Sequence, residues 1–276
     1  MPNRVTDVAA RTDRGLVREQ NEDRWLVRTR AGTTLLAVAD GVGGVEGGEI
    51  ASTAAIAGLA SAFVGPSYRE SSRSSLSVAV EAANAAVLAA STTEHLPNAA
   101  TTLVAAAVRG YHAVIANLGD SRAYLVHGTA LRQITTDHSG ATTSSITRFA
   151  GDRRGVQPDI FMETLQAGDR LVLCSDGLTR HVTDAEICTA AADPPAKAAD
   201  ALIALARSRG GEDNVTVVVY AAGKPAVSRA LVGTLILALL ILIAIAGALG
   251  ALVTTPVPPA ATSPSPSAGP TATATP

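Results

Sequence analysis

The chain has 276 residues, enough for one large or two small domains, and its formal charge is −2. This balance excludes a protein that binds nucleic acid through a strong overall positive charge. The composition changes along the chain, because residues 1–222 mix charged, apolar and turn residues whereas residues 230–253 contain no charged side chain.

The first part of the chain predicts two neighbouring strands that lead to a glycine-rich turn. A polar cluster, Asn21-Glu22-Asp23, precedes a strand over residues 25–29, and a hairpin loop at residues 30–32 returns the chain to the apolar run Leu35 to Ala39. This run ends at Asp40, and five glycines between residues 41 and 48 would let backbone and ligand come close. Asp-Gly is also ordinary turn chemistry, so the motif alone does not establish a site.

The middle of the chain predicts two alanine-rich helices, over residues 49–62 and 75–90, followed by closely spaced strands. Short turns separate these strands, a spacing that builds antiparallel ladders and not the parallel sheet of a doubly wound fold. The predicted strands cover Thr101 to Val108, His112 to Asn117, Ala123 to Val126 and Ala130 to Ile134.

The last part of the soluble region repeats the pattern of a strand beside an aspartate. Residues 135–157 are polar and irregular and predict a mobile surface loop, after which a strand over residues 170–174 runs into Asp176-Gly177. Thr183 and Glu186 have the spacing of a capping box, which predicts the start of a helix. A helix over Pro195 to Ser208, the polar triplet Glu212-Asp213-Asn214 and a β-branched strand over Val215 to Ala221 follow.

The segment over residues 230–253 predicts a transmembrane helix. At 1.5 Å per residue, about 24 residues make a helix of roughly 36 Å, long enough to cross a hydrocarbon core of about 30 Å. Lys224 and Arg229 precede it and no ionisable side chain follows it, so the domain of residues 1–222 is expected in the cytoplasm. Residues 223–229 are then a juxtamembrane linker, and residues 254–276 a disordered extracellular tail rich in Pro, Ser and Thr.

The aspartates at strand ends predict an acidic pocket. Asp40, Asp176 and Asp213 are accompanied by Asp120, and by Glu22 and Asp23 in the first segment. Several carboxylates cannot stay ionised side by side without cations, and oxygen ligands without Cys or His suit Mg²⁺ or Mn²⁺.

Two such ions about 3.5 to 4 Å apart lower the pKa of a water and orient it for in-line attack on phosphorus. Arg18 would supply the fork that holds two phosphate oxygens. No covalent nucleophile is evident, because the sequence has no Gly-x-Ser-x-Gly and no Cys in a phosphate-binding loop.

Several short motifs in one order give the region from about Val5 to Tyr220 a specific resemblance. It resembles the metal-dependent PP2C-type protein serine/threonine phosphatases, most of all their bacterial, membrane-anchored members. The motifs are Arg18 with Asn21-Glu22-Asp23, Ala39-Asp40-Gly41-Val42-Gly43-Gly44, Gly119-Asp120-Ser121-Arg122, Thr136-Asp137-His138-Ser139, Ser175-Asp176-Gly177 and Asp213-Asn214.

The resemblance implies an α+β fold, a four-layer α-β-β-α sandwich of two antiparallel sheets flanked by helices, to which the sequence adds the C-terminal transmembrane helix. Asp40 would bridge both ions, Gly41 would bind one through its carbonyl, and Asp176 and Asp213 would complete the first site. Glu22 would act through a metal-bound water, Asp120 would help to hold a third, weaker ion, and Arg18 would contact the substrate phosphate.

The sequence departs from the family pattern in three places. Few residues separate Ser139 from Ile146, so a flap of some thirty residues that is usual in the family is largely missing. Val42 stands where some members have a histidine proposed as general acid. Arg180 stands where some have a further acidic ligand, which weakens the third metal site.

The leading hypothesis is a membrane-tethered phosphatase that hydrolyses phosphoserine and phosphothreonine in proteins and opposes cytoplasmic Ser/Thr kinases. The alternative, favoured by the short flap, is a catalytically weak phosphoprotein-binding sensor of the same fold. A Mg²⁺-dependent nuclease is disfavoured because the chain has no basic stripe, so no nucleic-acid partner is expected.

Overall fold

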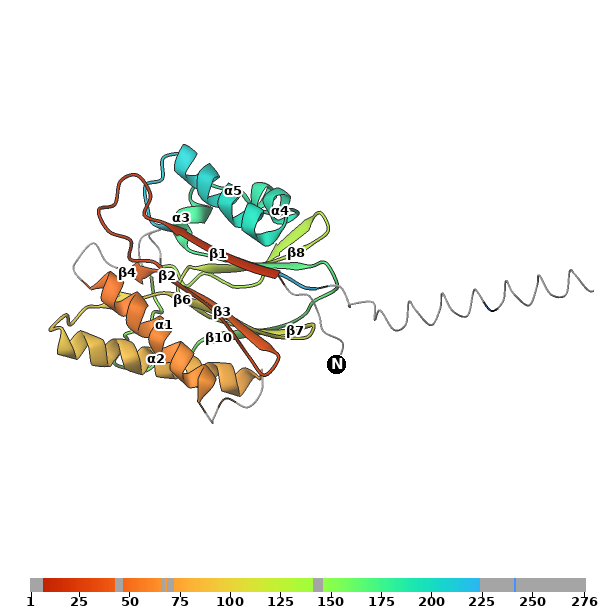
Figure 1. Cartoon of the computed structure of the whole chain (residues 1–276). Coiled ribbons are helices and arrows are strands. Elements are labelled where there is room, and N and C mark those ends of the chain that lie inside the picture. The colour runs from red at the N-terminus through yellow and green to blue at the C-terminus, as the bar shows by residue number, and fades with distance from the viewer. Residues whose placement is uncertain are drawn as a thin grey trace, which may run out of the picture. The chain divides into compact units, whose positions relative to one another are not determined.

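Two five-stranded antiparallel sheets lie face to face at the centre of the fold (Figure 1). The computed structural model describes residues 7–42, 47–65, 68, 72–140, 146–223 and 241. The chain divides into two units, Met1–Ala226 and Val227–Pro276, and every strand described here belongs to the first unit. The antiparallel arrangement expected from the short turns is confirmed.

The first sheet has the strand order β1-β12-β11-β8-β9, and the second has the order β10-β7-β6-β3-β2. A short ladder of β4 (Gly41–Val42) and β5 (Ala100–Thr101) stands at the end of β3. The first sheet comprises β1 (Asp7–Asp13), β12 (Val215–Ala221), β11 (Arg170–Cys174), β8 (Arg122–His127) and β9 (Ala130–Gln133), and the second β10 (Asp159–Thr164), β7 (His112–Leu118), β6 (Leu103–Arg109), β3 (Thr33–Ala39) and β2 (Arg24–Arg30).

Strand β3 is buried on both faces, which explains why its sequence is apolar at every position from Leu35 to Ala39 rather than alternating. Successive side chains of a strand point to opposite faces. Leu36 and Val38 therefore join the core between the two sheets, while Leu35 and Ala37 join the core beneath the helices. Opposite Leu36 stand Val27 on β2 and Ala106 on β6.

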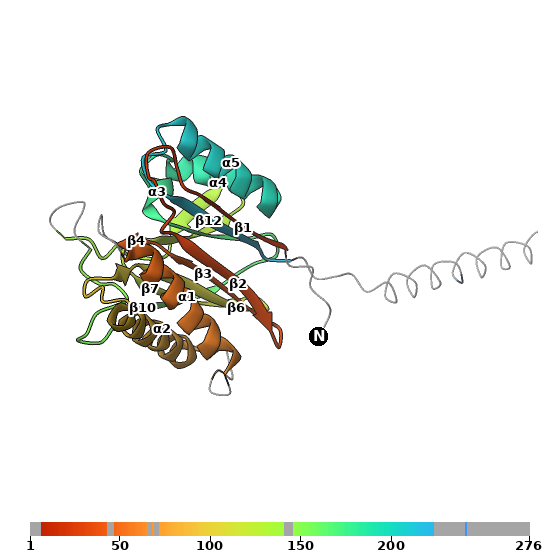
Figure 2. The same ribbon diagram turned by 60° about the vertical axis from the view of Figure 1, so that its left-hand side comes forward.

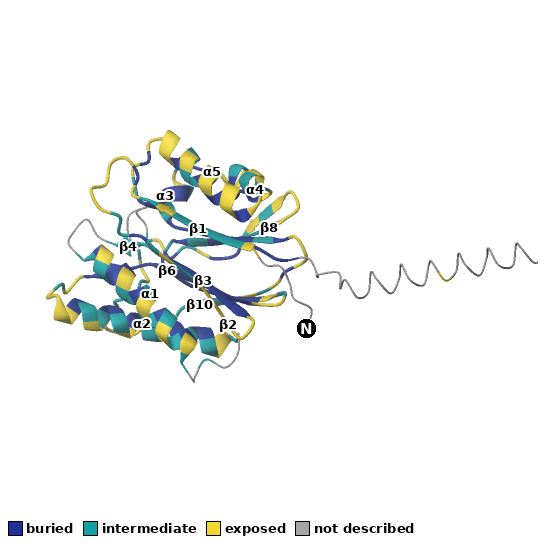
Figure 3. Ribbon diagram, viewed as in Figure 1, coloured by how far each residue is buried: buried dark blue, intermediate teal, exposed yellow. Residues whose placement is uncertain are grey.

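Helices cover the outer face of each sheet (Figures 1 and 2). Helices α1 (Gly48–Val64) and α2 (Arg73–Thr93) pack on the second sheet, and α3 (Asp176–Thr179), α4 (Asp184–Ala191) and α5 (Pro195–Ser208) pack on the first. Buried residues face the sheets and exposed ones face outward (Figure 3). The result is four layers, α-β-β-α, as the family resemblance implied.

Local sequence signals place several of these elements. The predicted capping box is present, because Glu186 Oε2 accepts hydrogen bonds from the backbone N–H of Thr183 at 3.0 Å and from its hydroxyl at 2.8 Å. Gly58 allows α1 and α2 to pack closely, because a Cβ there would lie 2.8 Å from both Ala82 O and Ala86 Cβ.

Two edge strands were not predicted from the sequence. Strand β1 pairs with β12 along its whole length, although Asp7–Asp13 carries three charged side chains and has few fully apolar positions. Strand β10 pairs with β7, and Met162 is exposed on it. Both strands lie at sheet edges, where one side needs no partner and the apolar pattern is weak.

The prediction of a surface loop over residues 135–157 is only partly right. The described part of this stretch contains irregular backbone, but Thr135 and His138 are buried. His138 Nδ1 accepts a hydrogen bond from Gly119 N at 3.1 Å, and its Nε2 lies 3.0 Å from Asp159 Oδ2. The start of the stretch is thus packed against the sheet.

The predicted transmembrane helix at residues 230–253 and the tail at 254–276 lie outside the described residues, apart from Ile241. Among the helices that are described, α2 alone is long and apolar enough to cross a membrane. Helix α2 packs on the second sheet through Leu76, Val80 and Val87, so we interpret it as a core helix.

Candidate active site

Four aspartates from four different connections meet at one end of the two sheets. Asp40 follows β3, Asp120 lies between β7 and β8, Asp176 opens α3 after β11, and Asp213 stands two residues before β12. The negative charges of Asp23, Asp176, Asp213 and Asp120 all help to raise the pKa of Asp40, after burial as the main cause. The convergence predicted from the strand ends is therefore present.

The backbone of Asp40 is fixed by two threonines of the neighbouring connection. Asp40 O accepts hydrogen bonds from Thr102 N and Thr101 Oγ1, both at 2.8 Å, and Asp40 N donates to Thr102 Oγ1 at 3.1 Å. Thr102 Oγ1 also lies 2.7 Å from Ser121 Oγ, beside Asp120. This chain of hydrogen bonds ties Asp40 to the turn that carries Asp120.

Asp176 and Asp213 are brought together by a close backbone approach. A Cβ on Gly177 would lie 2.0 Å from Asn214 O, so only glycine fits after Asp176. Asp213 Oδ2 is bound by Arg18 Nη2 at 2.9 Å and is 3.6 Å from Arg180 Nη1, and Arg180 Nη2 binds Asp176 Oδ2. Arg18, predicted to bind phosphate, thus stands at the edge of the acidic cluster.

Asn214 holds the loop that carries Arg18 and Glu22. Its Nδ2 donates to Arg14 O and Gln20 O, both at 2.9 Å, and its Oδ1 accepts from Glu22 N at 2.8 Å. Three backbone groups of one loop are satisfied by a single buried side chain. The sequence motif named Asn214 without giving it this role.

Gly48, at the start of α1, packs against Glu22. A Cβ on Gly41 would lie 2.5 Å from the Gly48 carbonyl, and a Cβ on Gly48 would lie 2.8 Å from Glu22 Cδ. Burial raises the pKa of Glu22, while the nearby Arg18 lowers it and Asp213 raises it. Glu22 therefore belongs to the same electrostatic cluster.

Asp23 also belongs to the cluster, although the sequence analysis assigned it no role. It is 1% exposed, and its Oδ2 accepts a hydrogen bond from Ser175 Oγ at 2.7 Å, while Ser175 Oγ accepts from Thr216 N at 2.9 Å. Burial raises the pKa of Asp23 to about 6, and hydrogen bonds from Thr216 and Ser175 oppose that rise. The only sequence signal for Asp23 was its position next to Glu22, and that position does not predict that the Asp23 side chain is buried.

The donor set fits hard divalent cations. Burial and the charge of Asp176 raise the pKa of Asp120 to about 6, and its buried Oδ1 has no hydrogen-bond partner in the described structure. Carboxylates that repel one another are stabilised by a bound cation. Because all the donor atoms of this cluster are oxygens, the cation that suits it is Mg²⁺ or Mn²⁺. In the described ranges no three Asp, Glu, His or Cys side chains are already grouped around one point that could hold an ion. The ligand roles of Asp40, Gly41, Asp120, Asp176, Asp213 and Glu22 stay predictions.

Comparison with known proteins identifies the family. The family model described as protein phosphatase 2C matches residues 16–211. The chain belongs to the protein phosphatase 2C family. The chain is 40% identical over 235 residues to the serine/threonine protein phosphatase PstP of Mycobacterium tuberculosis, covering 78% of this chain and 45% of PstP. It therefore spans less than half the length of that relative.

Other relatives support the same membership in protein phosphatase 2C. The serine/threonine phosphatase stp of Listeria monocytogenes is 36% identical over 232 residues, covering 75% of this chain and 92% of stp. Among solved structures, PstP/Ppp of M. tuberculosis matches with a TM-score of 0.69 at 38% identity, over 79% of this chain and 99% of that one. The PstP catalytic domain in complex with two manganese ions matches with a TM-score of 0.69 at 39% identity, over 78% and 97% of the two chains.

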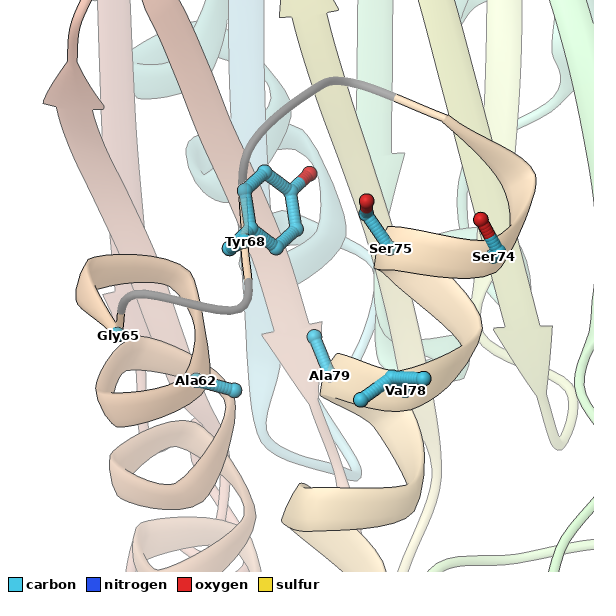
Figure 4. Close-up of a pocket in the computed structure, with 7 residues that line it drawn as sticks. All are labelled: Ala62, Gly65, Tyr68, Ser74, Ser75, Val78 and Ala79. Atoms are coloured by element: carbon cyan, nitrogen blue, oxygen red, sulfur yellow. The ribbon is translucent and has the colours of Figure 1, made fainter.

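A cavity of this protein phosphatase 2C lies between α1 and α2, and no residue of the carboxylate cluster lines it (Figure 4). It measures about 310 Å³ and its lining includes the ring of Tyr68, which packs edge-on against Phe63 at 4.9 Å between ring centroids. No charged residue lines it, so it offers no phosphate site. The other lining residues are Ala62, Gly65, Ser74, Ser75, Val78 and Ala79.

Proposed function

We propose that this protein hydrolyses phosphoserine and phosphothreonine in proteins with the help of two divalent cations, Mn²⁺ or Mg²⁺. The observation that carries the proposal is the convergence of Asp40, Asp176 and Asp213 beside the guanidinium of Arg18. The family membership supports it, as does the PstP structure with two manganese ions.

The residues divide the work between cation binding and substrate binding. Asp40, Asp176 and Asp213 would hold cations with the carbonyl of Gly41, Glu22 and Asp120 would stand around them, and the bound ions would supply an activated water and charge neutralisation. Arg18 would turn its fork from Asp213 to two oxygens of the substrate phosphate. Hydrogen bonds with Thr101 and Thr102 position the backbone of Asp40.

Val42 stands where some members of the family have a histidine proposed as general acid. Val42 pairs with Ala100 in the short ladder, and its side chain carries no proton to donate. The leaving serine or threonine oxygen would therefore take its proton from solvent at the site. Cleavage should then depend on the charge of the carboxylate cluster and not on a histidine.

Phosphopeptide hydrolysis by the purified full chain tests this function. We expect turnover with Mn²⁺, loss of turnover on chelation, and at least a hundredfold loss in Asp40→Asn. Turnover that survives chelator or the substitution at full rate would refute the metal mechanism. Phosphopeptide binding without turnover would instead support a sensor of the same fold.

We also propose a single-pass membrane location with the phosphatase domain of residues 1–222 in the cytoplasm. The uncharged run over residues 230–253 supports it, together with Lys224 and Arg229 just before the run. In that setting the substrates would be the products of cytoplasmic Ser/Thr kinases. Membrane fractionation followed by protease treatment of intact cells tests the location, because only residues 254–276 should be cleaved from outside.

A further inference from the structure

Two arginines from distant parts of the chain meet at one carboxylate of the site. Arg18 Nη2 is 2.9 Å from Asp213 Oδ2, and Arg180 Nη1 is 3.6 Å from the same oxygen while its Nη2 binds Asp176. The role expected of Arg18 is phosphate binding. Arg180 has no such role, yet it contacts two of the four aspartates predicted to bind cations.

Arg180 also lies within electrostatic range of the rest of the cluster. The charges of Asp176, Asp213 and Asp40 all stabilise its protonated form, and its own charge lowers the pKa of Asp120. Its side chain is 49% exposed, against 17% for Asp176 and 15% for Asp213, so it covers these carboxylates from the solvent side. Arg180 N donates to Asp176 O at 2.9 Å, which fixes the backbone from which the side chain reaches back.

The contact of Arg180 with Asp176 and Asp213 changes the net charge of the cluster. The mutually interacting groups include six carboxylates and two guanidiniums, which leave four net negative charges when all are ionised. Glu49 and Asp137 also act on this cluster, but each is paired with its own arginine, Arg24 and Arg122, so these pairs leave the balance unchanged. Two divalent cations balance that charge, and a third would leave the site positive. An acidic residue in place of Arg180 would instead leave six negative charges. The carboxylates are Glu22, Asp23, Asp40, Asp120, Asp176 and Asp213, and the guanidiniums are Arg18 and Arg180.

We propose that Arg180 is a fixed cation supplied by the protein itself, which competes with divalent cations for Asp176 and Asp213 and limits the site to two of them. The inference rests on the proposed function, because it concerns how the same site loads its cations. Arginine suits this role since its guanidinium stays protonated at every physiological pH. The protein should then need more divalent cation than one with a neutral residue at position 180.

Calorimetric titration of the metal-stripped full chain in mild detergent with MnCl₂ tests the inference. We expect two equivalents for the unsubstituted protein. Arg180→Gln should keep two equivalents and bind them roughly two- to tenfold more tightly, the effect of removing one partly screened charge contact. Arg180→Asp should add a third, weaker equivalent, and Arg180→Lys should stay near the unsubstituted protein because it keeps the charge.

A matched control is Arg209→Gln, which removes another half-exposed arginine that binds Glu186 at 2.5 Å and does not belong to the cluster. Its Mn²⁺ binding should be unchanged. Equal stoichiometry and affinity in the unsubstituted protein, Arg180→Gln and Arg180→Asp would overturn the role of Arg180 and leave the proposed function intact. An unsubstituted protein that binds no Mn²⁺ would overturn both. If Arg180→Asp fails to fold by circular dichroism, the affinity of Arg180→Gln decides alone.

Discussion

The side chain of Asn214 accepts a hydrogen bond from the backbone N–H of Glu22 at 2.8 Å, joining parts of the chain 192 residues apart. With its two further bonds to Arg14 O and Gln20 O, this amide fixes the loop on which Arg18 stands. The site thus depends on a residue that neither binds a cation nor contacts phosphate by the roles proposed here.

We expect Asn214→Ala to lower both stability and activity. Loss of a buried amide that satisfies three backbone groups should cost about 2–4 kcal/mol of unfolding free energy. The freed loop should also lower kcat/KM by at least tenfold at a temperature where the protein is folded. Urea denaturation and phosphopeptide kinetics measure the two effects.

Asn84 provides the matched control. It is similarly buried and links α2 to a distant loop, with its Oδ1 accepting from Gly151 N at 2.7 Å and its Nδ2 donating to Asp152 O at 3.2 Å. Asn84→Ala should cost comparable stability and leave kcat/KM almost unchanged. An equal loss of kcat/KM in both variants would contradict a specific role for Asn214.

The strands beside the site could be predicted from the sequence because an aspartate lies within two residues of one end of each apolar run. Strand β3 is the clearest case, since both its faces are buried and Asp40 ends the run. Edge strand β1 gave no such signal, because its pattern mixes charged and half-buried residues and its place depends on pairing with β12. Tertiary contact decides such strands more than local sequence does.

The carboxylates of the site could be predicted from the sequence, but the hydrogen bonds that position them could not. Acidic residues at strand ends predict that these carboxylates converge. The hydrogen bond from Ser175 to Asp23, and the one from Glu22 N to Asn214, each join segments more than 150 residues apart. Such pairings leave no trace in spacing or composition, so only the folded chain reveals them.

Arg18 should act mainly on substrate binding. Arg18→Ala removes the proposed phosphate fork, so we expect kcat/KM to fall at least tenfold, chiefly through a higher KM. Arg18→Lys should recover part of the loss because it keeps the charge without the fork. Arg14, whose side chain binds only Glu19 O at 3.1 Å in the described structure, is the control in the same loop. A KM effect of equal size in Arg14→Ala would show that loop order, and not the fork, is responsible.

The metal-free protein should become more stable as the pH falls from about 7 to 4. Asp120 has a pKa of about 6 when folded and near 3.8 when unfolded, and Asp23 behaves alike, so the folded state binds protons more tightly. The unfolding free energy therefore falls as the pH rises through this window, by an amount on the order of 1–3 kcal/mol for Asp120.

Denaturant titrations in chelator at several pH values measure this slope. Asp120→Asn should flatten it and should stabilise the metal-free protein at pH 7. Asp193→Asn, at an exposed aspartate paired with Lys197 at 3.1 Å, serves as the control and should leave the slope as it was. Stability that rises with pH over the same range in chelator would show that burial and the neighbouring charges do not raise the pKa of Asp120 and Asp23.

Gly48→Ala should separate activity from stability. The new Cβ would lie 2.8 Å from Glu22 Cδ, the far end of a flexible side chain, so the Glu22 carboxylate must move while the backbone stays. Alanine is the better helix former, so stability should hold or rise by up to about 1 kcal/mol while kcat/KM falls several-fold. Gly58→Ala in the same helix should do the reverse, because its Cβ meets Ala82 O and Ala86 Cβ, both at 2.8 Å, and must push α1 from α2. Thermal melts and kinetics of the two variants should therefore show opposite effects, and a stable, fully active Gly48→Ala would exclude Glu22 from the reaction.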